Sequence, residues 1–205
     1  MSRSEQKLQT RQRILDAAGR GFRKGGFGGV GVDGLAKEAG VTSGAFYVHF
    51  DSKATAFRES VAQGMLDLKN GVRDYQTTYG RTWWSEFVRF YLGAKRKCEL
   101  SESCALQSLP TEVARSDASS RAAFEAELLD VAAVVASGPA SNDAPPDVDA
   151  AMAALATLVG AVTLARAVDD SSAAERIAAA AERILLPTRH VKATTRKAAS
   201  RRTTK

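Results

Sequence analysis

Apolar residues recur at helical spacing along most of this chain, with polar residues between them. The first such segment predicts an amphipathic helix over about residues 7–24, with Ser4 or Thr10 as its N-cap. A glycine-rich stretch, residues 25–34, is expected to end that helix, because glycine is costly inside a helix. The apolar positions of the segment are Ile14, Ala17, Ala18 and Phe22.

Two short helices are predicted directly after the glycine-rich stretch. Gly40 is expected to end the first of them, because glycine adopts the left-handed conformation at little cost. Thr42 or Ser43 can cap the second, which should run through about His49. The apolar positions of the first short helix are Val32, Leu35, Ala36 and Ala39.

The rest of the chain carries longer apolar stripes. A long helix capped by Asp51 or Ser52 should come first, then a turn at residues 74–81, a short helix around Pro110 and a loop at residues 137–147. The stripes are Phe57, Val61, Met65, Leu68 and Val72; Trp84, Phe87, Val88 and Tyr91; Phe124, Leu128, Val131 and Val135; Val148, Met152, Leu155, Val159 and Val162; and Ile177, Ala181, Ile184 and Leu185. Because the sequence has no internal repeat and no convincing strand, the pattern predicts an all-α protein.

The length of 205 residues fits one domain, or a small domain joined to a larger one. The charged N-terminus lacks the apolar core of a secretory signal, and no stretch approaches the roughly 18 apolar residues that span a bilayer. Two cysteines, Cys98 and Cys104, are too few for a disulfide framework. We therefore expect a reduced, cytoplasmic protein with no membrane partner.

The net charge of +6 is unevenly distributed along the chain. Residues 1–60 carry +4, residues 61–188 carry −5, and residues 189–205 carry +7. The basic ends predict contact with a polyanion, although solvated surface gives the same pattern. Residues 189–205 have almost no large apolar side chain, so we expect a disordered basic tail that either adds non-specific DNA affinity or is idle.

Within the glycine-rich stretch GGFGGVGVDG, Gly26, Gly28 and Gly31 match the spacing G-x-G-x-x-G of a dinucleotide-binding loop. Such a loop needs a strand before it, and here a helix is predicted instead. The Gly-Lys-Ser/Thr of a Walker loop is also absent. A joint between two helices is the better interpretation, and an oxidoreductase is the enzyme alternative.

The segment LAKEAGVTSGAFYVHF has the spacing of a helix-turn-helix, with a small residue, a turn glycine and an apolar residue between two short helices. The second helix must enter a major groove about 12 Å wide, so its leading turn needs short side chains. Tyr47 and His49 are longer and can reach phosphates or base edges, and Lys53 can contact phosphate. The expected DNA contacts are Gly31, Val32, Thr42, Ser43, Gly44, Ala45, Tyr47, His49 and Lys53.

From about Arg11 to Val61 the sequence resembles the TetR (tetracycline-repressor-like) family of transcriptional regulators. The resemblance rests on RILDAAGRGFRKGGF, VDGLAKEAGV and TSGAFYVHFDSKATAF. It implies a three-helix DNA-binding head at residues 1–51 and a larger helical ligand-binding and dimerisation body at residues 52–188. It also implies a homodimer that represses from a palindromic DNA operator, is released by a small-molecule effector, and is not an enzyme.

One departure from the family pattern falls just before the second helix. The family usually has Thr or Ser near positions 30 and 31, where this chain has Val30 and Gly31. The hydroxyl contact to phosphate is therefore lost, although the backbone N–H of Gly31 or Val32 can still meet one. Asp33 lies in the first turn of the second helix, where the helix dipole favours a carboxylate, so we expect its role to be structural.

The body offers candidates for an effector pocket. Few charged residues lie among its aromatic and sulfur-bearing side chains, which favours an apolar or aromatic effector, although core packing explains the same residues. Those charged residues are Glu86, Arg89, Glu99 and Glu112. The candidate lining residues are Trp84, Phe87, Tyr91, Cys98, Cys104, Leu106 and Phe124.

The two thiols, Cys98 and Cys104, are six residues apart. They make too small a metal site when the only histidines are His49 and His190, so no metal and no other cofactor is expected. A repressor that senses electrophiles or oxidants through these thiols remains an alternative, as does a non-specific, nucleoid-type DNA binder.

Two Ala-rich segments near the C-terminus have small-residue faces that permit close helix approach. The family resemblance implies that these helices pair with their symmetry mates as a four-helix dimer interface, and packing within one chain is the alternative. The expected interface residues are Leu155, Val159, Val162, Ile177, Ala181 and Ile184.

Overall fold

The computed structural model describes residues 2–187, and the expected basic tail at residues 189–205 lies outside them. Every regular element within the described residues is helical, which confirms the all-α prediction. The helices are α1 (Arg3–Gly29), α2 (Val32–Glu38), α3 (Ser43–His49), α4 (Lys53–Tyr79), α5 (Trp83–Phe90), α6 (Ala105–Ser108), α7 (Pro110–Ala114), α8 (Ala118–Ala136), α9 (Val148–Ala167) and α10 (Ser171–Leu185). Tight turns of 3₁₀ type lie at Gly80–Thr82 and Leu100–Glu102, and a π-helical turn lies at Tyr91–Lys95.

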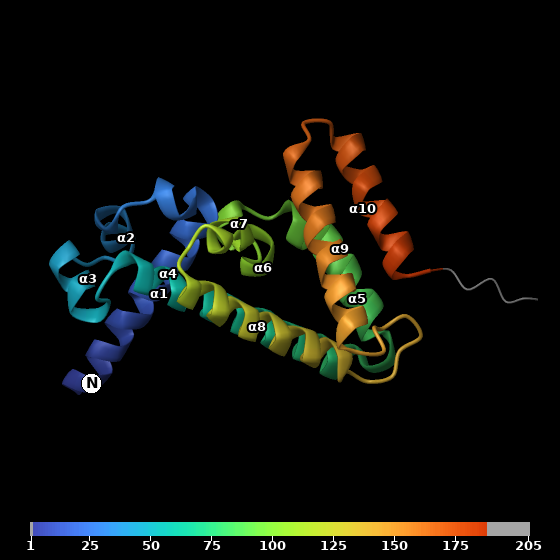
Figure 1. Ribbon diagram of the computed structural model, residues 1–205, viewed down its shortest axis with the longest axis horizontal. Helices are drawn as coiled ribbons and strands as arrows, with labels where there is room; N and C mark the ends of the chain where they lie inside the picture. The colour runs from blue at the N-terminus through green and yellow to red at the C-terminus, as the bar shows by residue number, and fades with distance from the viewer. Residues whose placement is uncertain (1, 188–205) are drawn as a thin grey trace, which may run out of the picture.

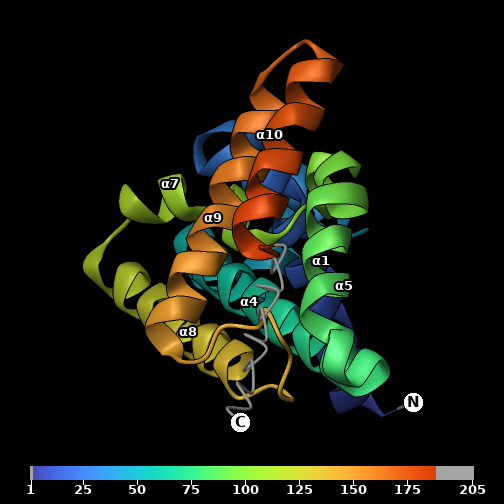
Figure 2. The same cartoon turned by 90° about the vertical axis from the view of Figure 1, so that its right-hand side faces the viewer.

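Figure 1 shows a head formed by α1, α2 and α3 at one end of an elongated molecule, with α4 running from it into the body. α8 lies alongside α4 for most of its length. At the far end of the body, α10 lies between α9 and α5 (Figure 2). Buried apolar side chains of the head and of the body belong to one continuous cluster. The boundary expected between residues 51 and 52 therefore stays a prediction.

Helix α1 begins earlier than the apolar pattern predicts. Its N-cap is Ser2, whose hydroxyl accepts a hydrogen bond from the Glu5 N–H at 3.2 Å, while the Glu5 carboxylate accepts from the Ser2 N–H at 2.6 Å. This capping box stabilises an exposed helix start that carries no apolar stripe. The prediction of Ser4 or Thr10 as the cap is therefore wrong.

Helix α4 begins as expected, with the Ser52 hydroxyl capping the Thr55 N–H at 3.0 Å. The turn expected at residues 74–81 is wrong for most of its length, because α4 continues to Tyr79. Aromatic contacts stabilise the additional turns, because the centroid of the Tyr75 ring lies 5.6 Å from the ring centroids of both Phe87 and Phe90. Gly80, with a φ of 51°, then ends it.

Helix α9 is long and apolar enough to cross a membrane by length and composition alone, contrary to the sequence expectation for the whole chain. One such helix is weak evidence of a membrane span, because a core helix passes the same test. Its buried face packs on α8 and α10. The residues of that face are Ala151, Ala154, Leu155, Leu158, Ala161, Val162 and Ala165.

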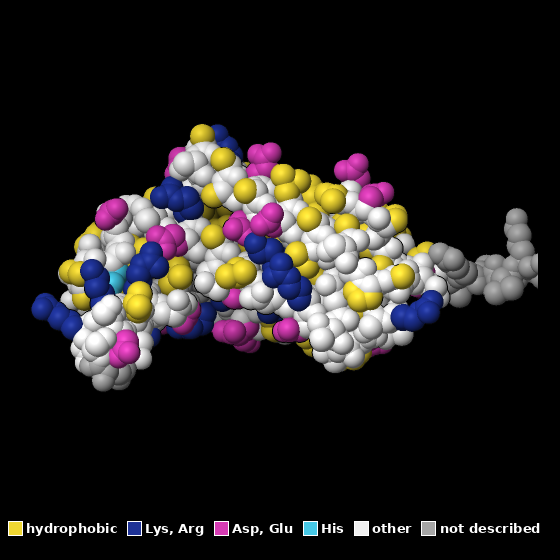
Figure 3. All heavy atoms as spheres, turned by 90° about the horizontal axis from the view of Figure 1, so that it is seen from below, with side chains coloured by type: hydrophobic (Ala, Val, Ile, Leu, Met, Phe, Trp, Pro, Cys, Tyr) yellow, Lys and Arg dark blue, Asp and Glu magenta, His cyan; other side chains and the backbone are white. Residues whose placement is uncertain are grey.

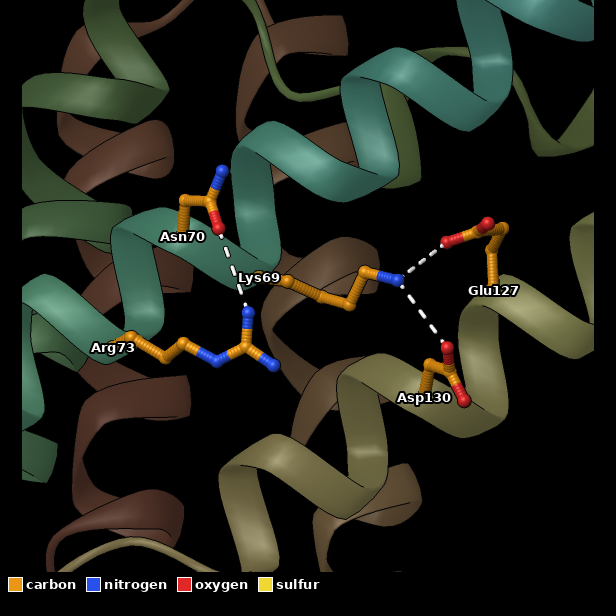
Figure 4. A network of polar contacts seen from close by, with 5 residues as sticks. All are labelled: Lys69, Asn70, Arg73, Glu127 and Asp130. Carbon is orange, nitrogen blue, oxygen red and sulfur yellow. Dashed lines mark hydrogen bonds and ion pairs between the residues drawn. The ribbon is translucent and has the colours of Figure 1, made fainter.

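A buried lysine fixes α4 against α8. The Lys69 ammonium extends from α4 between two carboxylates of α8 and lies 2.8 Å from Glu127 and 3.3 Å from Asp130 (Figure 4). The hydrogen bond to Glu127 is the main reason that the pKa of Lys69 lies above its ordinary value. A buried charge needs such partners, so this contact specifies how the two helices align.

Asp117 makes the start of α8 sensitive to acid. Its carboxylate accepts hydrogen bonds from the Ser119 hydroxyl at 2.7 Å and the Ser120 N–H at 2.8 Å, which lower its pKa from 3.8 to about 2. Because the folded pKa is depressed, its contribution to stability is present above pH 3.8 and is lost as the pH falls toward about 2. We expect the free energy of unfolding, measured with urea, to fall less for Asp117→Asn than for the native chain as the pH is lowered across that interval. Parallel pH curves for the two chains would contradict this.

Candidate DNA-binding head and effector cavity

The turn between α2 and α3 has the geometry that the sequence predicts. Gly40 has a φ of 68°, and the Val41 N–H donates to the Ala36 carbonyl oxygen at 2.9 Å. Thr42 is the N-cap of α3, and its hydroxyl accepts a hydrogen bond from the Ala45 N–H at 3.2 Å. This N-cap satisfies one of the free N–H groups of a short helix and fixes its direction.

Helix α3 has one buried aromatic face and one exposed face. Phe46 and Phe50 are buried in the core with ring centroids 5.6 Å apart, which anchors the helix to the head. Tyr47 and Val48 point outward and are 55% and 69% exposed. An apolar side chain this exposed on a short helix is available to contact a partner such as a thymine methyl group. Val48 was not among the contacts expected from the sequence, because helical spacing alone does not separate it from the core positions.

The expected DNA contacts at the start of α3 are exposed to different degrees. Thr42 and Gly44 are exposed, whereas Ser43 and Ala45 are half-buried. The Ser43 hydroxyl donates a hydrogen bond to the Asp33 carboxylate of α2. Asp33 therefore ties the two short helices together, in agreement with a structural role.

Two other expected contacts, His49 and Lys53, are partly withdrawn from the surface. Burial, with Lys7 and Arg11 nearby, lowers the pKa of His49, so its ring is neutral at pH 7. Among the described residues, its buried Nδ1 atom has no hydrogen-bond partner. The Lys53 ammonium lies 4.4 Å from the centre of the Phe27 ring, which holds the side chain against the head.

Lys and Arg side chains surround a histidine at the head end of the molecule (Figure 3). Arg11 of α1 lies over the Phe50 ring at 4.7 Å and forms an ion pair with Glu59 of α4. Beside α3, Gly31 is exposed as the N-cap of α2 and has no side chain with which to cap it, and Val32 is half-buried. The head thus presents positive charge next to the outward face of α3, as binding to a phosphate backbone requires.

The glycine-rich stretch breaks α1 instead of ending it outright. Gly26 has φ 70° and ψ 175°, and one further helical turn runs from there to Gly29. The Glu112 carboxylate of α7 accepts a hydrogen bond from the Phe27 N–H at 3.1 Å. A side chain of the body therefore holds the joint from which the chain enters α2.

A cavity of about 310 Å³ lies in the body beside the end of α1. Its inner part is formed by buried residues of α4, α5 and the segment before α6, whereas Asp67, Phe90 and Glu102 are exposed at its mouth. The lining residues are Arg23, Gly64, Asp67, Leu68, Gly71, Tyr75, Phe87, Phe90, Tyr91, Lys95, Glu102, Ser103, Cys104 and Ala105. Its volume falls at the lower end of the range for small-molecule sites.

Of the seven residues expected to line a pocket, the structure brings Phe87, Tyr91 and Cys104 to this cavity. The others lie elsewhere. Trp84 is fully buried and its indole N–H lies 3.4 Å from the Leu185 carbonyl oxygen. The Cys98 thiol donates to the Lys95 carbonyl oxygen at 3.1 Å. Leu106 packs in the core, and Phe124 lies beside a separate gap of about 10 Å³ between α4 and α8.

The cavity is more charged than expected, and its charged residues differ from those that the sequence suggested. Two basic side chains, Arg23 and Lys95, face two acidic ones, Asp67 and Glu102. Arg23 donates from Nε to the Ser101 carbonyl oxygen at 2.7 Å, and burial lowers its pKa. Because Arg23 belongs to α1, the DNA-binding head contributes directly to the wall of the cavity.

No group of three or more His, Cys, Asp and Glu residues that could hold a metal ion occurs within residues 2–187.

Comparisons with known proteins match the head of this chain to bacterial transcriptional regulators. The family model for bacterial regulatory proteins of the tetR family matches residues 14–59. The chain is 37% identical over 71 residues to the HTH-type transcriptional regulator TtgR of Pseudomonas putida, which is 35% of this chain and 31% of that protein. It is 47% identical over 51 residues to AcrR of Shigella flexneri, which is 25% of this chain and 24% of AcrR. These alignments span about a third or less of the curated relatives.

Solved structures extend the likeness to the whole fold. The reduced form of E. coli NemR superposes with a TM-score of 0.68 at 20% identity, covering 84% of this chain and 94% of that one. A TetR-family regulator from Agrobacterium tumefaciens gives a TM-score of 0.67 at 20% identity, covering 87% and 98%. At this identity the likeness establishes the fold, while the matched sequence of the head identifies the group. Residues 14–59 of the chain therefore belong to the TetR family of helix-turn-helix transcriptional regulators.

Proposed function

We propose that this protein is a cytoplasmic repressor that binds a palindromic DNA operator as a homodimer and is released by a small, mainly aromatic effector. The observation that carries the proposal is the cavity whose wall includes Arg23 of α1. A ligand there touches both the head and the body. It can therefore favour one spacing of the two α3 helices over another.

Close packing of α4 on α6 supports this coupling. A Cβ atom added to Gly64 of α4 would lie only 2.5 Å from the Cβ of Ala105, and both residues line the cavity. A contact this close transmits displacement, because neither backbone can move toward the other. A ligand that pushes on Ala105 therefore acts on α4, which leads directly into the head.

The surface available for dimerisation is the outer face of α9 and α10. Leu155, Val162 and Ala181 are already buried within the protomer, so they cannot supply the contact surface that the sequence analysis expected. Val159 and Ile177 are half-buried, and Ile184 is 70% exposed. Other exposed or half-buried residues on this face are Ala156, Gly160, Leu164, Ala173 and Ala180. Small residues surrounding a few large apolar ones favour close helix pairing.

The double variant Leu164→Glu/Ile184→Glu tests this interface. These side chains are 60% and 70% exposed in the protomer, so the charges should leave the fold intact but be buried and unpaired in the dimer. We expect light scattering to show half the native mass. We also expect affinity for a palindrome selected in vitro from random DNA to fall about 100-fold. Leu129→Glu, at a similarly exposed position on α8, is the matched control. A native mass for the double variant would refute the interface.

A thiol-based repressor is a second candidate, favoured by the position of Cys104 on the cavity wall. A reactive molecule in the cavity would reach this thiol directly. Cys98 lies outside the cavity, with its thiol 3.4 Å from the Arg166 guanidinium. The non-specific contribution of residues 189–205 to DNA binding stays a prediction.

A further inference from the structure

The inner end of the cavity contains one polar group without a partner. Tyr91 is only 3% exposed, and its hydroxyl makes no hydrogen bond with any other described residue. Leaving a buried hydroxyl without a hydrogen bond destabilises the folded state, so a native structure that retains one usually has a use for it. The Tyr91 side chain lines the cavity while its hydroxyl is closed to solvent, so a bound molecule becomes its partner by moving the side chains between them.

The surroundings of Tyr91 determine what kind of partner it accepts. Burial raises the pKa of Tyr91 well above its usual value of 10, so the phenol is neutral and can donate a hydrogen bond. Cys104 raises this pKa further, through its charge and as the nearest hydrogen-bonding side chain, although the two groups do not meet the geometry of a full hydrogen bond. The Ser103 hydroxyl is already bonded to the Leu100 carbonyl oxygen and to Ser108. A ligand oxygen that accepts a hydrogen bond fits this position.

The rest of the lining argues against a charged ligand. Arg23 and Lys95 balance Asp67 and Glu102, so neither an anion nor a cation finds a net opposite charge. The Lys95 ammonium donates to the Glu102 carbonyl oxygen, and the Arg23 Nε donates to Ser101. The remaining wall is mostly aromatic, from Tyr75, Phe87 and Phe90. The cavity has about twice the ~150 Å³ that accommodates one benzene ring, which suits a two-ring compound.

We propose that the effector is an uncharged aromatic carbonyl compound, whose rings lie against Phe87 and Tyr75 and whose carbonyl oxygen accepts a hydrogen bond from Tyr91. This rests on the proposed function, since it names the chemistry of the molecule that occupies the effector cavity. A carbonyl oxygen is a strong acceptor and brings no donor of its own that the apolar inner wall would leave unpaired.

The experiment compares two probes of nearly equal shape, 2-acetylnaphthalene and 2-ethylnaphthalene, by equilibrium dialysis against the full chain. The native protein should bind the ketone about tenfold more tightly than the hydrocarbon. Tyr91→Phe should remove that preference while binding the hydrocarbon at least as well. The variant should fold, because the hydroxyl that it loses makes no hydrogen bond with the described residues.

Tyr79→Phe is the matched control, because Tyr79 is an exposed tyrosine of α4 that does not line the cavity. It should keep the tenfold preference. The proposal is overturned if Tyr91→Phe retains the preference, if Tyr79→Phe abolishes it, or if neither probe binds the native protein. Release of operator DNA is measured separately. A ketone that binds through Tyr91 without releasing DNA leaves the ligand class standing and refutes the proposed effector response.

Discussion

Gly44→Glu is expected to lower affinity for the selected operator about 100-fold or more, because a carboxylate on the leading turn of α3 would face the phosphates and base edges of DNA. Gly44 is exposed, and a Cβ added to it would meet only the Thr42 hydroxyl oxygen, at 3.8 Å. The fold should therefore tolerate the substitution. Binding is measured by fluorescence anisotropy at fixed salt, with Ala122→Glu on the exposed face of α8 as the charge-matched control.

Gly44→Ala separates contact with DNA from stability. Alanine in a helix is more stable than glycine by about 0.5–1 kcal/mol, so this variant should unfold at a slightly higher temperature. Its methyl group nevertheless occupies the surface that we propose meets the major groove, and affinity should fall about tenfold. If both Gly44 variants bind as the native chain does, α3 does not present its leading turn to DNA.

Phe57→Ala should cost about 3–5 kcal/mol of the free energy of unfolding, because it removes a large ring from a fully packed part of the core. Phe57 is 2% exposed, and its ring lies edge-on to Phe22 at 5.2 Å and to Phe27 at 5.3 Å. These three rings join α1, the glycine joint and α4. Truncating one of them opens a cavity where the head meets the body.

Thermal unfolding measures this loss. For a domain of this size each kcal/mol lowers Tm by about 2–4 °C, so the midpoint should fall by roughly 10 °C. Leu129→Ala, which truncates a half-exposed leucine on α8, should change Tm by only a small fraction of that. A loss below about 1 kcal/mol for Phe57→Ala would mean that the three rings do not hold the head to the body.

The head could be predicted from sequence because its determinants are local. The Thr42 hydroxyl caps the N–H of Ala45, three residues ahead of it, and Gly40 supplies a left-handed turn at its own position. Such rules depend only on neighbouring residues. The apolar stripe of α4 was equally readable, because helical spacing identifies a buried face wherever that face packs.

The cavity could not be predicted in the same way, because its walls come together from distant parts of the chain. Arg23 donates to Ser101, and Gly64 lies against Ala105. Nothing in the local sequence of either residue indicates its partner. The burial of Leu155, Val162 and Ala181 within the protomer could not be predicted for a related reason. A stripe with helical spacing shows that a helix buries one face, but it does not say whether another helix of the same chain or of a second copy covers it.

The glycine joint at residues 25–34 has a composition that lowers its local stability. Of the glycines in residues 25–34, only Gly26 has a positive φ, and a Cβ at Gly28, Gly29 or Gly31 would meet nothing within 4 Å. Neither backbone geometry nor crowding requires glycine at those three positions. Each of them raises the conformational entropy of the unfolded segment and so makes its ordered form easier to melt locally. The joint between α1 and α2 is therefore thermodynamically soft by composition, and a carboxylate of the body, 85 residues along the chain, forms a hydrogen bond with it.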